Sequence, residues 1–551
     1  MDSTTVVGWA QIACFIAVLS ALVVPLGAYI ARVFARPPTA LELRLLRPEP
    51  QDWKAYARSA IVFSFVCMVA LYGLLRTQGL YPFNARHFGS GTWDVSFNTA
   101  ASFVSNTSWQ FYAGETTLSA FSQMAGIAVH SYLGAGVGLA VAVAVIRGVS
   151  AQSGTALGCF WVDLWRALAY VIVPITVIAA LVFLTQGIVQ SVDQPVATWA
   201  AIKTLGSVGG GFFNVNSAMP FENASGLSSF LQALLIVLVP AALTHTFGRM
   251  VGSRRQGWAL YGVMLLLFAG SVAVIYAAEA HGTPAQLAAG VHGVNLEGKE
   301  QRFGVAGTAL YAAATTTGSS GAVNGAMESF SGLGGLIAVA NMATGEVIFG
   351  GIGSGLYGIL MTVMLAVFLA GLMVGRTPEY LGKTIGAREI KLVVIGTIGV
   401  PCFVLAITAL AVATSYGRAS IFASGGPQGF AESVYAYVSQ AFNNGSAYAG
   451  YTGYAQPNAP GNVGAYGITF ADLAGGVTMV VGRYAPMIAA LGVAGSLAGR
   501  RTRPPGLGTL RTDSPTFAAV LIGVIALVTL LTFVPAFMLG PAAQALTHRL
   551  F

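Results

Sequence analysis

Long apolar stretches separated by short polar segments run through almost the whole of this 551-residue chain. An α-helix needs about 20 apolar residues to cross a bilayer, and each stretch reaches that length. The pattern therefore predicts an all-α polytopic membrane protein with ten transmembrane helices. The predicted spans are 8–31, 59–77, 119–146, 165–187, 227–248, 258–279, 333–374, 390–415, 468–498 and 515–540.

The seventh stretch, 333–374, is too long for one crossing. It contains a run in which four of six residues are glycine, and glycine permits irregular backbone. We predict a helix that is broken there by a loop inside the membrane. The glycines of this break are Gly350, Gly351, Gly353 and Gly355.

Four polar segments lie between pairs of spans and recur about every 100 to 125 residues. Each follows a short apolar segment, such as 97–103 or 198–202, that suits a helix crossing half the membrane. Non-helical backbone at membrane depth is tolerated only where it is buried in protein or lines a watery cavity. Four such loops can present carbonyl oxygens to one axis, as a dehydrated monovalent cation requires. The candidate filter residues are Asn106, Thr107, Ser108, Ser207, Val208, Gly209, Ser319, Ser320, Gly321, Asn443, Asn444 and Gly445.

The unit of span, pore helix, loop and span is predicted four times around a pseudo-fourfold axis, with one extra helix at each end. A single loop rich in Gly, Asn and Ser would more often be an ordinary external turn, but four equivalent loops favour the filter. The predicted segments are an N-terminal helix with a basic loop, four pore repeats and a C-terminal helix. Their bounds are 1–58, 59–150, 151–250, 251–385, 386–500 and 501–551.

The residue types of the four loops favour a monovalent ion. Val208 can offer an ion only its backbone, and no triplet contains Asp or Glu. Divalent cations are usually held by carboxylates, so the absence of acidic side chains favours a large monovalent ion such as K⁺.

Composition and charge agree with a membrane protein. The chain is 55% hydrophobic and 8% charged, against about 25% charged residues in a soluble domain. The net charge of +8 could suggest nucleic acid, but most Lys and Arg residues fall in alternate connections between spans. The positive-inside rule then makes those connections cytoplasmic and puts the N-terminus outside. We expect contact with membrane lipid and none with nucleic acid.

No motif for catalysis or nucleotide binding is discernible. The chain has no phosphate-binding loop, its four cysteines are scattered, and its histidines lack metal spacing. A membrane-embedded enzyme would need nucleophile, acid–base or metal residues at one depth, and no such set stands out.

Charged residues near the loops suggest further roles. Arg483 lies inside the ninth stretch, where a charge is costly and indicates function. We hypothesise that Arg483 is an electrostatic barrier on the cytoplasmic side of the filter, with Glu346 as its counter-charge. Glu222, after the second loop, could attract cations to the mouth or, as we slightly favour, cap the next helix.

Seven segments of the chain together resemble the KdpA family, the potassium-binding subunits of bacterial Kdp K⁺-transporting ATPases. The resemblance runs nearly end to end. It rests on residues 105–110, 209–217, 220–223, 321–324, 345–358, 375–383 and 443–447.

The resemblance implies a non-catalytic, channel-like subunit of an ATP-driven high-affinity uptake pump in the bacterial cytoplasmic (inner) membrane. Such a subunit selects K⁺ from outside, binds no nucleotide, and passes the ion sideways to a KdpB-like P-type ATPase subunit. On the same resemblance we expect this path to be gated at the broken span, with Gly350, Gly351, Gly353 and Gly355 as candidate gating residues. KdpC-like and KdpF-like subunits complete the complex. The resemblance places Gln110 just behind the first filter strand, with Gly210 and Gly211 as further supports. The alternative is a stand-alone K⁺ channel or ion-coupled symporter of the same superfamily.

The chain departs from the family pattern at two places. The second filter strand commonly has Thr-Asn before its first Gly, and here Ser207-Val208 stands there. The third commonly has Cys before Gly321, and here Ser320 stands there. Backbone carbonyls survive both changes, so we expect selectivity to be retained and K⁺ affinity to be the property at risk.

Overall fold

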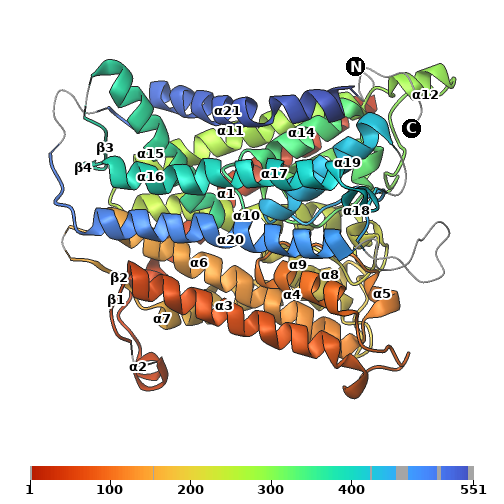
Figure 1. Cartoon of the computed structure of the whole chain (residues 1–551), viewed down its shortest axis with the longest axis horizontal. Helices are drawn as coiled ribbons and strands as arrows, with labels where there is room; N and C mark the ends of the chain where they lie inside the picture. Colours follow the sequence, from red (N-terminus) through yellow and green to blue (C-terminus); the bar gives the residue numbers. More distant parts are fainter. Residues whose placement is uncertain are drawn as a thin grey trace.

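The computed structural model describes residues 3–46, 48–152, 154–375, 377–421, 425–453, 469–504 and 510–543. Over these ranges the chain is a bundle of long helices (Figure 1), and ten of them are long and apolar enough to cross a membrane. The predicted fold class is thereby confirmed. Three of the basic residues used in the orientation argument, Arg47, Arg376 and Arg549, lie outside the described residues, and the orientation stays a prediction.

Nine of the ten spans begin and end within several residues of the predicted bounds. The seventh, predicted over 333–374, spans only the second part of that stretch and begins at Ser354. Four of the ten contain or end in a π-helical segment, where the helix widens locally. The ten spans are α1 (Ser3–Ala35), α3 (Trp53–Arg76), η2 with α6 (Ser122–Ala128, Val129–Ser150), α7 with η3 and α8 (Phe160–Arg166, Ala167–Ile172, Val173–Thr185), α10 (Gly226–Met250), α11 (Arg254–Glu279), α15 (Ser354–Val374), α16 with η6 and α17 (Ala387–Val394, Ile395–Gly399, Val400–Ala413), α20 (Thr469–Ala498), and α21 with η8 (Pro515–Phe537, Met538–Ala542).

Burial separates central spans from peripheral ones. The most apolar windows of the third and fifth spans are 83% and 78% buried, whereas that of the second span is 28% buried. Large apolar side chains such as Phe65 and Leu531 are exposed on outer helices. A helix that leaves such residues exposed needs an apolar solvent, so the outer surface suits lipid.

Four shorter helices lie between pairs of spans, where the pore helices are predicted. They are α4 (Trp93–Val104), α9 (Val196–Leu205), α13 (Gly304–Thr317) and α19 (Gly426–Ala441). Each leads into one of the four polar loops and then, through the loop, into the next membrane-crossing segment. The pseudo-fourfold relation between the four units stays a prediction.

The predicted break in the seventh stretch is present. The helix α14 (Gly332–Ala343) has 12 residues and cannot cross alone. Residues 344–353 are not helical, and α15 (Ser354–Val374) then resumes. Several residues in the break have positive φ, including Gly350 at 66° and Gly353 at 87°. Because an α-helix requires negative φ, a continuous helix does not form there.

The two ends of the bundle carry different small elements (Figure 1). At one end, β1 (Gln51–Asp52) pairs antiparallel with β2 (Ala156–Gly158), and β3 (Glu379–Tyr380) pairs antiparallel with β4 (Lys383–Thr384). The short helix α2 (Ala40–Leu46) lies at that end too. The helices α5 (Gly114–Thr117), α12 (Pro284–Ala288) and α18 (Ser415–Arg418) lie at the other.

A buried ion pair fastens α2 to the spans. Both Arg166 nitrogens Nε and Nη2 lie 2.8 Å from the carboxylate oxygens of Glu42, and Glu42 is 1% exposed. The hydrogen bond from Arg166 holds the pKa of Glu42 at about 2, below its ordinary 4.5. Because the folded pKa is depressed, the pair stabilises the fold fully above pH 4.5, and that stability is lost as pH falls toward 2.

We expect Glu42→Gln to lower the free energy of unfolding by about 3 kcal/mol at pH 7, because it leaves the Arg166 charge buried without its partner. The thermal unfolding midpoint of the purified protein at pH 7 measures the loss. At pH 3 the difference between variant and parent should shrink. Equal midpoints at pH 7 would contradict the assignment, and Glu49→Gln, a change at an exposed acid outside α2, is the control.

Candidate functional site

All four pore helices end in the same backbone motif. The residue that follows the last turn has a left-handed φ in each case: 67° at Asn106, 45° at Ser207, 47° at Ser319 and 49° at Asn443. The next residue donates its N–H back into the helix, as in a Schellman motif. These bonds are Thr107 N to Ser102 O at 2.9 Å, Val208 N to Lys203 O at 3.0 Å, Ser320 N to Thr315 O at 3.0 Å and Asn444 N to Ser439 O at 2.8 Å.

The four loops contact one another in cyclic order. Loop one reaches loop two through Asn106 Nδ2, which lies 3.1 Å from the Ser207 carbonyl. Loop three reaches loop two through Gly321 N, 2.7 Å from the Val208 carbonyl. Loop four closes the ring on both sides: Asn444 Nδ2 lies 3.0 Å from the Ser320 carbonyl, and Asn443 Nδ2 lies 2.8 Å from Thr107 Oγ1. The structure thus brings the four predicted triplets together around one point.

Glycine is required where the loops approach most closely. A Cβ on Gly209 (φ +119°) would overlap the nitrogen of Gly321 and lie 2.5 Å from its Cα. A Cβ on Gly445 (φ +98°) would overlap the Thr107 carbonyl. These glycines allow backbone rather than side chains to form the inner surface.

Each loop keeps a buried carbonyl without a hydrogen-bond donor. Within the described chain, the backbone oxygens of Thr107, Gly209, Gly321 and Asn444 accept no hydrogen bond. Buried carbonyls are normally paired, so their orphaned state in all four loops indicates a ligand that replaces the missing donors. The pore helices end at the same loops, and the negative end of a helix dipole favours a cation there.

Gln110 clamps loop two from behind. Its Oε1 accepts from Gly211 N at 2.9 Å, and its Nε2 donates to the Gly211 carbonyl at 3.3 Å. The same Oε1 lies 3.0 Å from where a Cβ of Gly210 would be. The three predicted filter supports therefore lie together.

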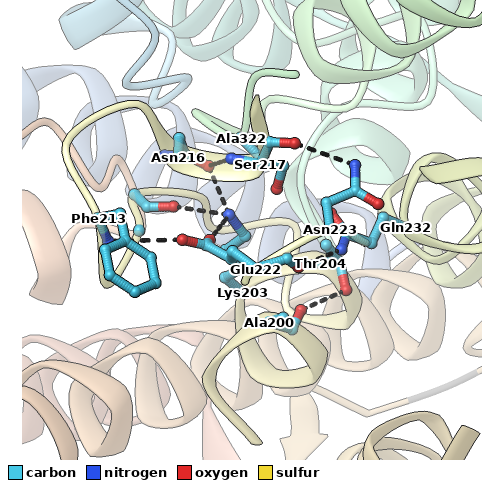
Figure 2. A network of polar contacts seen from close by, with 12 residues as sticks. Ala200, Lys203, Thr204, Phe213, Asn216, Ser217, Glu222, Asn223, Gln232 and Ala322 are labelled. Atoms are coloured by element: carbon cyan, nitrogen blue, oxygen red, sulfur yellow. Dashed lines mark hydrogen bonds and ion pairs between the residues drawn. The ribbon is translucent and has the colours of Figure 1, made fainter. Parts of the chain in front are cut away.

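A buried lysine also holds loop two, and the sequence analysis missed it. Lys203 lies in the last turn of α9 with its side chain 1% exposed. Its Nζ is 3.1 Å from the Gly210 carbonyl and also donates to Asn216 Oδ1 and pairs with Glu222 (Figure 2). The signal was available: a lysine within a short apolar helix needs a buried partner, and an acid follows 19 residues later.

Both interpretations of Glu222 were wrong. Its side chain is fully buried against Lys203, so it does not attract ions at an open mouth. Ser225, not Glu222, caps α10 by accepting from Ser228 N at 3.0 Å. The hydroxyl of Ser225 occupies the capping position, and the carboxylate of Glu222 pairs with the buried Lys203 instead.

The broken segment lies directly against loop three. Gly350 N donates to the Thr317 carbonyl at 2.8 Å. On its other side, a Cβ on Gly353 would overlap the Gly138 carbonyl of α6. Within the break itself, a Cβ on Gly355 would overlap the Phe349 carbonyl. A Cβ on Gly351 would lie 3.8 Å from the Ser319 Cβ. The break that carries the candidate gating glycines thus packs between loop three and α6.

Arg483 lies beside the break and forms no direct salt bridge with Glu346 in the described part of the chain, so its pairing with Glu346 as counter-charge stays a prediction. The guanidinium, 3% exposed, donates through Nη2 to the Gly134 carbonyl of α6 at 3.3 Å. Glu346 instead accepts from Ser354 Oγ and, at 3.3 Å, from Gly351 N. The two charges still interact electrostatically, because the break holds Glu346 near Arg483 while satisfying its carboxylate locally.

A cavity opens beside this segment. It lies between the break, α15, η6, α20 and α21. Its lining includes Glu346, Tyr357, Gly396, Gly482 and Thr529.

Comparison with known proteins gives a consistent result. The family model described as Potassium-transporting ATPase A subunit matches residues 13–546. A potassium-transporting ATPase potassium-binding subunit of Mesorhizobium japonicum is 46% identical, covering 98% of each chain. The protein of the same name from Methylorubrum extorquens is also 46% identical, covering 98% of this chain and 97% of its own.

Among solved structures, the crystal structure of the potassium transporter TrkH from Vibrio parahaemolyticus is similar in fold. The TM-score is 0.53 at 13% identity, over 88% of this chain and 96% of that one. At this identity the likeness concerns the fold alone.

Proposed function

The chain belongs to the KdpA family of potassium-transporting ATPase A subunits, and on that premise we propose that the ring of four loops is its K⁺ selectivity filter. The protein is a multi-pass membrane subunit that binds K⁺ for a potassium-transporting ATPase. The filter consists of the twelve residues of the four triplets, with Gln110, Gly210 and Gly211 as supports.

One observation carries the filter proposal: each loop of a closed ring retains a buried carbonyl that has no hydrogen-bond donor among the described residues. A cation that has lost its water needs several such oxygens at once, and carbonyl dipoles provide them without a fixed charge. No acidic side chain belongs to the triplets, which favours a monovalent ion.

The residues at the two departures from the family pattern have protein partners of their own. Ser207 Oγ donates to the Ile236 carbonyl at 2.6 Å, and the Val208 carbonyl is used by Gly321 N. Ser320 Oγ accepts weakly from Ala322 N at 3.4 Å. We therefore expect selectivity for K⁺ to be retained with this set of residues.

The ion leaves sideways through the cavity beside the broken segment, toward a KdpB-like P-type ATPase subunit that hydrolyses ATP. The glycines of the break and Arg483 control that exit. KdpC-like and KdpF-like subunits complete the complex, which lies in the bacterial cytoplasmic membrane with the N-terminus of this chain outside. The chain itself binds no nucleotide.

The test is K⁺ uptake by a bacterial strain that lacks its own K⁺ uptake systems. The chain is expressed alone and then with its putative ATPase partners. Uptake at low external K⁺ only with the partners supports the pump subunit. Strong uptake by the chain alone would overturn this and identify a self-sufficient channel or symporter.

We expect Arg483→Ala to increase passive ion flux. Two unit charges about 8 to 12 Å apart at an effective dielectric constant of about 20 repel by about 1.5 to 2 kcal/mol. Losing that barrier should raise flux of ⁸⁶Rb⁺ into proteoliposomes without ATP by about tenfold or more. Arg483→Lys keeps the charge and is the matched control. If Arg483→Ala changes neither passive flux nor ATP-driven uptake, Arg483 is not the barrier.

A further inference from the structure

A second group of buried polar side chains lies behind loops one and four, away from the ring. Asp472, on the first turn of α20, is 1% exposed, and neither of its carboxylate oxygens has a hydrogen-bond partner in the described chain. Asp94 on α4, 8% exposed, interacts with it electrostatically. A buried carboxylate without a partner is costly, and a second one nearby raises the cost.

Two amides converge on the same place. Asn98 lies one turn after Asp94 and donates through Nδ2 to the Asp472 backbone carbonyl at 2.8 Å. Gln440 of α19 lies beside Gly475, one turn along α20, with its amide 2.8 Å from where a Cβ would stand. Both residues are at most 1% exposed, and Asn98 Oδ1 and Gln440 Oε1 have no donor within the described residues.

Among the described residues, the nearby tyrosine hydroxyls donate no hydrogen bond to the Asp472 carboxylate. Tyr437 and Tyr451 interact electrostatically with Asp472, but Tyr451 donates to Tyr437 at 2.9 Å rather than to the acid. The unsatisfied atoms are mostly acceptor oxygens: two from Asp472, one from Asn98 and one from Gln440. Oxygens that lack donors call for a cation, not an anion. Two carboxylates and amide oxygens match the preference of a hard divalent cation.

We propose that Asp472, Asp94, Asn98 and Gln440 form a second cation site that holds a non-transported divalent ion, with Ca²⁺ as the best match in charge and ligand type. The ion joins α4 and α19, the pore helices of loops one and four, to α20. It thereby fixes two sides of the ring from behind, at a place separate from the carbonyls that face the transported ion.

Direct binding tests the proposal. The full-length chain, purified with its partner subunits, is stripped of divalent ions with a chelator and kept in saturating K⁺ so that the filter is occupied. We expect one ⁴⁵Ca²⁺ to bind per chain in equilibrium dialysis. At 100 times the dissociation constant, Ca²⁺ should raise the thermal unfolding midpoint by about 2 °C.

Two variants and a control locate the ion. Asp472→Asn and Gln440→Leu should each lower ⁴⁵Ca²⁺ affinity by about tenfold or more, since each removes a ligand oxygen or its charge. Asp193→Asn, a change at an exposed acid elsewhere, should leave binding unchanged.

The proposal is overturned if the parent protein binds no Ca²⁺, or if Asp472→Asn binds it as tightly as the parent. It is also overturned if Asp472→Asn raises the midpoint without Ca²⁺ and Ca²⁺ stabilises neither protein, because the acid is then simply protonated. K⁺ binding to the same samples is measured separately, so failure here leaves the filter proposal standing.

Discussion

Replacing Gly209 by Asp is expected to raise the external K⁺ concentration for half-maximal uptake by about ten- to a hundredfold, because no side chain fits between loops two and three. The Cβ would overlap Gly321 N and lie 2.6 Å from Ala322 N, and the φ of +119° disfavours any residue other than glycine. Strain of this kind costs about 1 to 3 kcal/mol, and each 1.4 kcal/mol is tenfold in affinity.

The displacement acts on the filter itself. Gly321 N currently binds the Val208 carbonyl, so moving loop three breaks the contact between loops two and three. It also displaces the donor-free carbonyls of Gly209 and Gly321, which are half of the set that we assign to the ion. K⁺ affinity should therefore fall more than the abundance of the protein in the membrane.

The measurement is the K⁺ dependence of ATP-driven uptake, with the amount of complex quantified in the same membranes. Gly89→Asp is the matched control: Gly89 is exposed and has open space around its Cβ position. The control adds the same negative charge without a clash, so its affinity should be unchanged. An unaltered K⁺ affinity in Gly209→Asp would remove Gly209 from the filter.

The backbone plan of this protein could be predicted from its sequence because it follows from local properties. Spans are long apolar runs, pore helices are short apolar runs before polar loops, and the broken span is too long and rich in glycine. Each of these depends on residues close together in the chain, and lipid as a solvent enforces the pattern. The structure has all three.

The side-chain partners could not be predicted, since they depend on which elements meet in space. Glu346 and Arg483 have opposite charges, but they form their hydrogen bonds elsewhere. Glu346 accepts from Ser354 and Gly351. Arg483 donates to the Gly134 carbonyl on α6. Likewise the first residue of each loop is left-handed although none is glycine. Asn106 and Asn443 tolerate that conformation and use their amides to reach the neighbouring loop, which single-loop patterns do not reveal.

The buried lysine of loop two yields the second large prediction. Lys203→Met should destabilise the protein by about 3 to 5 kcal/mol, because it leaves Glu222 charged and unpaired in the interior. It also removes the donor to the Gly210 carbonyl, next to the filter residue Gly209. We therefore expect both a lower thermal unfolding midpoint and a weaker, less selective K⁺ interaction, measured by uptake of K⁺ and Rb⁺.

The double variant Lys203→Met with Glu222→Gln separates these two effects. It removes the uncompensated charge and should recover most of the lost stability, which a double-mutant cycle measures as a coupling energy. The Gly210 carbonyl still lacks its donor in that variant. We expect K⁺ affinity to stay about tenfold lower than in the parent, since an unmet buried acceptor costs about 1 to 3 kcal/mol. Full recovery of affinity together with stability would mean that Lys203 serves only Glu222, and that loop two holds its shape through Gln110 alone.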